Sequence, residues 1–288
     1  MVSVYKKELR SYFVGLTGYV SIALILALTG IFIKIVAFDA KYMFIQNTLP
    51  SAAIVLLVAI PIVAMSSFAG ERAQKTDTLL YSLPLSTSSI VIGKYLAMMT
   101  VLSVPVAIIS LVPFILDMYG TVDWFGIYTA ILLFLLLISA MTAICMFMSS
   151  ICESQVIAAV LGSCALIVCY FAAIMTSVIP KTETAAFISF QVLAILIGLI
   201  SYLFTKNRYI PFAVYAVLFT VITVIHLQNS AFFLDIFSNA VELFALFDRF
   251  ANAVNSKVFD VKTAVYYLSV AIFFNVLTVQ TVEKRRYS

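Results

Sequence analysis

Long apolar runs, separated by short polar stretches, cover almost the whole chain. A helix crosses the hydrocarbon core of a bilayer with about 20 apolar residues. Runs of that length predict eight membrane-spanning helices, over residues 18–38, 50–69, 90–116, 126–149, 155–178, 186–205, 210–227 and 264–282. Pro105 and Pro113 lie in the third run and predict a kink or a break near its outer end, because proline interrupts helix hydrogen bonding.

Composition leads to the same fold class. Hydrophobic residues make up 64% of the 288 residues and charged residues only 10%, whereas soluble domains carry about 45–50% and about 25%. Such a small number of charges cannot solvate a protein surface, so lipid must be the solvent. A backbone in lipid has to satisfy its own hydrogen bonds, and the runs are too long for the strands of a β-barrel. We therefore predict an all-α, polytopic transmembrane bundle that forms a single domain over residues 1–288.

The Lys and Arg residues indicate the orientation in the membrane. Eight spans place both termini on one side, and that side carries 11 of the 17 Lys and Arg residues. Basic residues concentrate in cytoplasmic loops. We therefore expect both termini, and the stretch 70–89 between the second and third spans, to lie on the cytoplasmic side of the membrane.

Residues 1–17 have the pattern of an amphipathic helix. Lys6, Lys7 and Arg10 form a polar face. The apolar and aromatic residues that recur at steps of three or four positions are Val2, Tyr5, Leu9, Tyr12 and Phe13. Such a helix lies in the interface of an anionic leaflet. An ordinary basic anchor of the first span would show the same residues, and the pattern alone does not separate the two.

The stretch 70–89 begins with a charged turn and continues as a short helical pattern. Apolar positions recur at helical spacing until Pro84 ends the pattern. The four hydroxyl residues that follow, Ser86, Thr87, Ser88 and Ser89, offer N-cap groups to the third span. The residues with helical spacing are Thr76, Leu79, Leu80 and Leu83. A short helix with one apolar side fits a groove on another protein. A plain connector is the alternative, but connectors are usually shorter and more polar.

The external stretch 228–263 is also rather apolar. Its charges are spaced like those of short amphipathic helices. We therefore expect helices that lie in the outer interface of the membrane or re-enter it.

Three stretches together resemble a known family. They read KKELRSYF, then GER…KTDTLLYSLPLSTSSIVIGKYLA, then FDVKTAVYYLS…VEKRRY. They resemble the permease subunits of ABC-2-type exporters, and most closely the gliding-motility type of ABC permease. That family carries E-x-x-x-G-T-x-x-x-L-x-x-[ST]-P after its second span and then a stretch that ends in G-K. The matching residues here are Glu71, Thr76, Leu79 or Leu80, Ser82, Pro84, Gly93 and Lys94.

The chain departs from the family pattern in two respects. Lys75 and Asp77 replace the commoner residues around the threonine. The family usually has six spans, so the sixth and seventh predicted spans look like an addition.

The resemblance implies specific partners. Residues 70–89 would be a coupling helix that inserts into a groove of a separate ATP-binding subunit, with contacts from Glu71, Arg72, Lys75, Thr76, Leu79, Leu80, Leu83 and Pro84. The first residues would be an interfacial connecting helix, with Tyr5, Lys6, Lys7, Leu9 and Arg10 at the membrane lipid. Two permease chains, either two copies or a copy and a paralogue, would work with two ATPases. No nucleic-acid partner is implied.

The motifs of nucleotide binding and catalysis are missing from the sequence. Gly93-Lys94 lacks the glycine spacing of a P-loop, so we expect ATP–Mg in the partner subunit and no cofactor in this chain. A metal site is not expected at His226, which is the single histidine. No serine, histidine and acid converge on a triad, so we expect no enzymatic activity of the chain itself.

Two other functions remain open at this point. An ion-coupled secondary transporter or channel would need ionisable groups inside its spans, or paired broken helices related by an internal repeat. Neither is seen in the sequence. A membrane scaffold or immunity-type protein would still dock a partner through residues 70–89 but would transport nothing. The sequence does not indicate the substrate.

Overall fold

A computed structural model describes residues 1–35, 45–76, 86–118, 123–178, 187–188, 191, 219–220, 222–223, 244–256 and 259–287. The chain divides into two compact units. One unit comprises Met1–Val168 together with Phe247–Ser288, and the other comprises Cys169–Leu246. Every element in the described part of the chain is a helix, which confirms the predicted all-α class.

Six helical segments in the described residues are long and apolar enough to cross a membrane. They are α2 (Leu16–Ile33), the segment Thr48–Met65 that joins α3 (Ile45–Ala52), η2 (Ala53–Val55) and α4 (Leu56–Met65), the pair α7 (Thr87–Ile109) and α8 (Val112–Asp117), α9 (Trp124–Ile151), α10 (Gln155–Val178), and α15 (Val261–Tyr287). They match the first five predicted spans and the last one. The predicted spans 186–205 and 210–227 lie almost entirely outside the described residues.

The third span is interrupted where proline predicts it. Helix α7 ends at Ile109 and α8 begins at Val112, with Pro113 in the first turn of α8. Proline is well tolerated in a first turn because the amide it lacks has no helical partner there. Pro105 lies inside α7, which continues past it.

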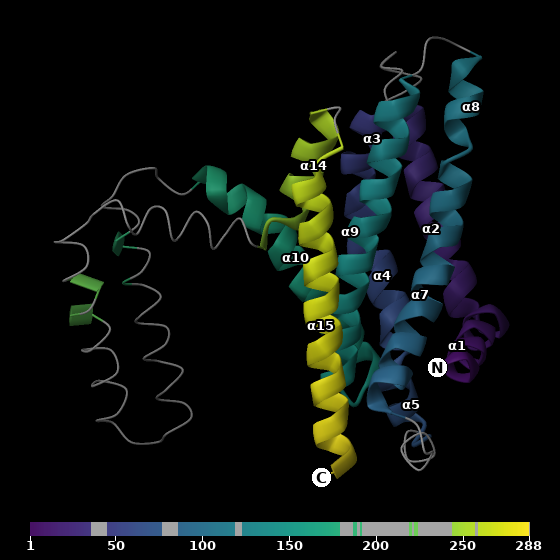
Figure 1. The fold of residues 1–288 in the computed structure, drawn as a ribbon, viewed down its shortest axis with the longest axis vertical. Helices are drawn as coiled ribbons and strands as arrows, with labels where there is room; N and C mark the ends of the chain where they lie inside the picture. Colours follow the sequence, from purple (N-terminus) through teal and green to yellow (C-terminus); the bar gives the residue numbers. More distant parts are fainter. Residues whose placement is uncertain are drawn as a thin grey trace. The chain divides into compact units, whose positions relative to one another are not determined.

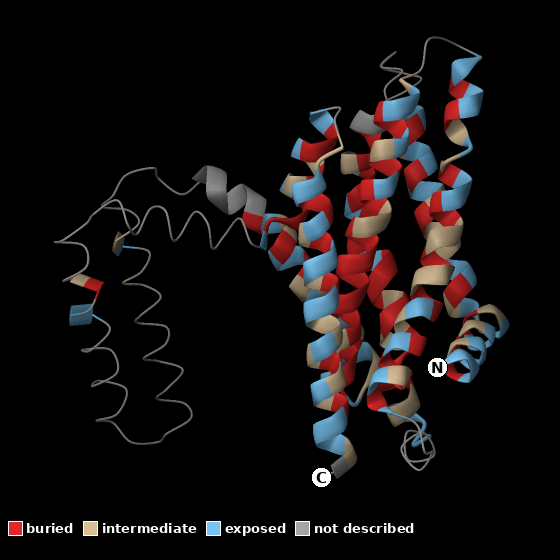
Figure 2. Ribbon diagram, viewed as in Figure 1, coloured by how far each residue is buried: buried red, intermediate tan, exposed pale blue. Residues whose placement is uncertain are grey.

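Helix α9 is the centre of the first unit. About 72% of its most apolar window is buried inside the protein, against 28% for α2 and 22% for α15. Figure 2 shows this helix as largely buried. It contacts α3, α4, α5, α7 and α15. Small residues allow the close approach of α10, since a Cβ at Gly162 would lie 3.4 Å from Cys145 Sγ.

The first unit has two ends that differ in their elements (Figure 1). Both chain termini, α1 (Val2–Val14) and α5 (Phe68–Ala73) lie at one end, which we call the terminal end. Helices α8 and α14 (Leu246–Asn255) lie at the opposite end, which we call the distal end.

Helix α1 is separated from α2 by Gly15, whose backbone is extended. A Cβ at Gly18 would lie 2.5 Å from the carbonyl oxygen of Tyr12, so only glycine fits where α2 turns past the end of α1. The residues of α1 that are buried are Val4, Glu8 and Tyr12. Of the predicted apolar face, only Tyr12 is among them. Tyr5, Leu9 and Phe13 are half-buried and Val2 is exposed. Contact of these four residues with lipid stays a prediction.

Helix α14 lies within the predicted external stretch 228–263. Phe250 is fully buried, and its ring centre lies 5.8 Å from that of Phe134 in α9. The Arg249 guanidinium lies 4.5 Å from the ring centre of Tyr266 in α15. This helix therefore packs on the bundle through one face, whereas residues 228–243 lie outside the described residues.

Candidate functional site

Helix α5 carries the start of the family motif and ends in a defined cap. The amide of Thr76 donates to the carbonyl of Glu71, and the amide of Lys75 donates to the carbonyl of Arg72. This pair of bonds is a Schellman motif, in which the residue after the cap takes a left-handed conformation. Lys75 takes it here, with φ of 55°. It stands at the glycine position of the motif, which explains why glycine is the commoner residue there.

The side chain of Glu71 points into the protein and joins a buried ionic group. We call Lys7, Glu8, Glu71 and Lys94 the Lys94 cluster. Lys94 Nζ lies 2.9 Å from Glu8 Oε1 and 3.0 Å from Glu71 Oε2. Lys7 Nζ lies 2.8 Å from Glu71 Oε1 and 3.8 Å from Glu8 Oε1. Two acids and two bases from α1, α5 and α7 therefore balance in charge.

The members of the Lys94 cluster differ in burial. The side chain of Lys94 is 0% exposed and that of Glu8 only 8%, whereas that of Lys7 is 59% exposed. Lys94 also donates to the Ser67 carbonyl over 3.2 Å and lies 5.0 Å from the ring centre of Phe68. A buried ammonium is stable only when it is paired and hydrogen-bonded. Lys94 meets that condition through two carboxylates and one carbonyl.

The charges in the Lys94 cluster set the ionisation of Glu71. Burial alone would raise the pKa of the Glu71 carboxyl, but the charge of Lys94 and the hydrogen bond from Lys7 outweigh it and lower that pKa. Burial alone would lower the pKa of Lys7, but its bond to Glu71 and the nearby acids raise it. Each group therefore favours the charged form of its partner.

The next residue, Arg72, ties α5 to the turn between α9 and α10. Its Nη1 donates to the carbonyl of Cys152 over 2.8 Å. Arg285 at the end of α15 donates to the carbonyl of Ile151 in the same turn. One turn thus receives a guanidinium from α5 and another from α15.

The start of α7 is also tied to α15. The Thr87 hydroxyl donates to the carboxylate of Glu283. Ser86 caps α7, and its Oγ accepts from the Ser89 amide over 3.4 Å, which confirms the predicted N-cap. Residues on both sides of 77–85 are therefore bonded to other helices.

The structure describes only part of the predicted site. Glu71 and Arg72 bond within the chain, while Lys75 and Thr76 are exposed at the end of α5. The predicted residues that lie outside the described residues are Leu79, Leu80, Leu83 and Pro84. Contact of any of these eight residues with a partner stays a prediction.

The predicted residues of the interfacial helix divide between four surroundings. The Tyr5 hydroxyl lies 3.0 Å from Thr100 Oγ1 of α7, and Lys7 belongs to the Lys94 cluster. Leu9 is half-buried. Lys6 and Arg10 are exposed.

Glu8 is the functional residue that sequence reasoning missed. It sits among basic residues, so the pattern assigned it no role. Its spacing of four from Val4 and Tyr12 places all three on one side of a helix, which is a signal for a buried face. Its partner Lys94 is 86 positions away, and no local pattern connects the two.

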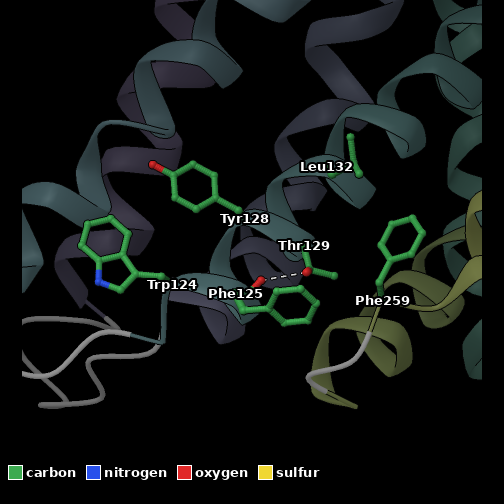
Figure 3. Close-up of a pocket in the computed structure, with 6 residues that line it drawn as sticks. All are labelled: Trp124, Phe125, Tyr128, Thr129, Leu132 and Phe259. Carbon is green, nitrogen blue, oxygen red and sulfur yellow. Dashed lines mark hydrogen bonds between the residues drawn. The ribbon is translucent and has the colours of Figure 1, made fainter.

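The distal end holds an apolar pocket of about 600 Å³ (Figure 3). Its lining is aromatic and aliphatic and comprises Trp124, Phe125, Tyr128, Thr129, Leu132 and Phe259. The Thr129 hydroxyl donates to the Phe125 carbonyl in its own helix, which leaves an apolar surface. An apolar chain or ring would fit this surface by shape. Within the part of the chain that the structure describes, no three His, Cys, Asp or Glu side chains gather as a metal site requires; His226 lies outside that part.

Comparison with known proteins gives one match. The family model described as ABC-2 family transporter protein matches residues 5–282. The match includes most of α1, the Lys94 cluster and most of α15. No curated protein and no solved structure matches the chain.

Proposed function

The chain belongs to the ABC-2 transporter family, and we propose that it is the membrane subunit of an exporter driven by a separate ATPase. It is a multi-pass membrane protein of the permease type. Within the family, the motif from Glu71 to Lys94 supports the gliding-motility type. The ATPase would attach at residues 70–89, and ATP–Mg would bind in that partner and not in this chain.

The observation that carries the proposal is how the two ends of that stretch are held. Glu71 joins the Lys94 cluster, Arg72 bonds to the turn between α9 and α10, and Thr87 bonds to α15. A force applied between these residues would reach α1, α7, α9, α10 and α15 together. An ordinary surface connector would not need bonds to so many helices.

The proposed cycle uses rigid-body motion. Two ATPases that close on ATP would move the attached stretch in each of two permease chains, either two copies or a copy and a paralogue. The helices bonded to that stretch would tilt with it and open a path outward. The chemistry of hydrolysis stays in the ATPase, and this chain supplies the moving parts.

The proposed orientation places the terminal end in the cytoplasm of a bacterial cell. On a helical wheel, the half-buried residues of α1 lie between its buried face and the exposed Lys6 and Arg10. Those half-buried residues are Tyr5, Leu9 and Phe13. This flank would rest on the lipid of the inner leaflet while Lys6 and Arg10 reach its anionic headgroups.

The test is purification of the tagged chain from its native membranes in mild detergent. We expect an ATPase with Walker motifs to co-purify in about equal amount and to hydrolyse ATP. Leu79→Glu and Leu83→Glu should lose that ATPase while the chain still elutes as a folded protein, because a charge would face the apolar groove. Val14→Glu is the matched control, since Val14 is 79% exposed on α1 and lies outside the stretch.

Two results would overturn the proposal. One is a chain that purifies alone and moves substrate down an ion gradient, which would make it a secondary transporter or channel. The other is an ATPase that stays bound in both Leu variants. Lys94 is an ionisable group inside the predicted third span, 90–116, and corrects the expectation that the spans hold none. It lies only about two turns into α7 at the terminal end, and its two acid partners come from α1 and α5, outside the spans.

A further inference from the structure

The Lys94 cluster lies where α1 approaches α7 most closely. A Cβ at Gly93 would lie 3.2 Å from the Met1 carbonyl oxygen and 3.2 Å from Val4 Cβ. The missing side chain at Gly93 therefore lets α1 lie against α7. The next residue, Lys94, extends from that contact and reaches the acids of both α1 and α5.

Lys94 is the member of the cluster that contacts α1, α5 and the turn before α5. It bonds to Glu8 in α1, to Glu71 in α5 and to the Ser67 carbonyl in the turn between α4 and α5, all from α7. Lys7 reaches only the two acids and is mostly exposed. Loss of Lys94 would leave Glu8 and Glu71 with only the exposed Lys7 as a cation, whereas loss of Lys7 would leave both acids paired with the buried Lys94.

The remaining polar ties of α1 to the bundle are few. Apart from the cluster, the side-chain hydrogen bonds shown between α1 and other helices are Tyr5 to Thr100 and Tyr12 to the Val63 carbonyl. The first bond also reaches α7. Release of Lys94 would therefore remove the ionic contacts of α1 and α5 with α7 at the same point.

We propose that Lys94 is a positioning residue that makes α1, α5 and the first turns of α7 move as one body, so that motion of the ATPase-docking stretch reaches the third span. This role rests on the proposed function, because the motion comes from the ATPase. Without Lys94 the ATPase would still bind and hydrolyse ATP, but the motion of the docking stretch would not reach the distal end.

The experiment uses the complete complex of chain and ATPase in lipid nanodiscs. Spin labels are placed on exposed positions of the distal end, at Met118→Cys in the C-cap of α8 and Val261→Cys in α15. The background is Cys164→Ser, because Cys164 is the exposed native thiol. The distance between labels is measured without nucleotide and with MgATP and vanadate. Rates of ATP hydrolysis are measured on the same samples.

The expected result distinguishes a complex that no longer transmits the motion from a complex that no longer assembles. The parent complex should show a change of distance on addition of MgATP and vanadate, and Lys94→Gln should lose it while hydrolysis stays within about twofold. Lys262→Gln is the matched control, because that lysine is exposed at the start of α15 in the distal end, and it should keep the full change. A Lys94→Gln complex that moves like the parent would overturn the proposal.

A second variant, Glu8→Gln, tests the proposal if Lys94→Gln fails to fold. Glu8→Gln keeps Lys94 paired with Glu71 and should speed amide exchange of residues 4–12 by at least about tenfold, since a buried ion pair is broken. The change of label distance should fall at the same time. Unchanged exchange and an unchanged distance would contradict the proposal. Failure of the proposed function itself would look different, because no ATPase would then co-purify with the parent chain.

Discussion

The two ends of the first unit are held together by different forces. At the terminal end, charged groups and carbonyls make directional bonds, as in the Lys94 cluster and the bond from Arg72 to Cys152. At the distal end, aromatic rings pack against one another in edge-to-face, stacked and tilted pairs, the last as between Phe134 and Phe250. The apolar pocket lies at that same distal end.

This difference has a physical consequence. A buried ion pair that loses one partner leaves an unpaired charge in a medium of low dielectric, so the terminal end has one favoured arrangement. Apolar contacts between helices in a bilayer can be exchanged for contacts with lipid tails of similar polarity. The terminal end is therefore suited to transmit a motion, and the distal end is suited to change shape.

Removal of the central charge should have the largest effect. Lys94→Met should lower the free energy of unfolding by about 3–5 kcal/mol, because Glu8 and the largely buried Glu71 lose their buried cation and keep only the exposed Lys7. Lys7→Met removes an exposed lysine from the same cluster and should cost at most about 1 kcal/mol. Thermal unfolding in detergent measures both. Equal losses would show that the burial of Lys94 does not matter.

Acid should loosen the terminal end before the distal end. The pKa of Glu71 lies below its usual value of 4.5, so its contribution is complete above that pH and is lost as pH falls through the lowered pKa. Amide exchange of α1, corrected for the intrinsic rate, should therefore rise below about pH 4.5 while exchange of α9 changes little. In the opposite direction, the raised pKa of Lys7 means that its smaller contribution is lost above pH 10.5. Exchange of α1 that stays flat in acid would contradict this account.

The same substitution at the two ends should have unequal effects. Thr87→Val removes a hydrogen bond to the Glu283 carboxylate and should cost about 1.5–3 kcal/mol, since the acceptor is charged. Thr129→Val removes a hydroxyl that bonds only to its own helix and should cost about 0.5 kcal/mol or less. Chemical unfolding of both variants tests the comparison. A larger loss at Thr129 would reverse it.

The smallest effect should be a gain in stability. Lys75 holds a left-handed conformation that glycine adopts without strain, so Lys75→Gly should stabilise the chain by about 0.5–1 kcal/mol. Lys75→Ala is the control, because alanine loses the same side chain but keeps the strain. A rise in melting temperature with glycine and none with alanine is expected. A rise with both would point to the lysine side chain instead.

Much of the fold could be predicted because a helix that crosses the lipid needs a long apolar run, and such runs are easy to recognise in a sequence. Six spans follow from apolar runs, the break before α8 follows from Pro113, and the cap of α7 follows from Ser86. The left-handed conformation of Lys75 could also be predicted, because the family motif carries glycine at that position.

The buried face of α1 could not be predicted in the same way. Apolar spacing pointed to Leu9 and Phe13, whereas the face that packs on the bundle carries Glu8 between Val4 and Tyr12. In a sequence, a buried glutamate looks the same as a surface glutamate until the residue that pairs with its charge is known. That partner, Lys94, is supplied by another helix, and only the fold brings the two together.

Site-specific photo-crosslinking in native membranes shows directly whether residues 70–89 dock an ATPase. A photoreactive amino acid is placed at residue 83 in one sample and at Met118 in the other, because Met118 is 84% exposed at the distal end. The account predicts an adduct with a Walker-motif ATPase at residue 83, altered by MgATP and vanadate, and none at residue 118. An ATPase adduct at neither position, or equally at both, would contradict it.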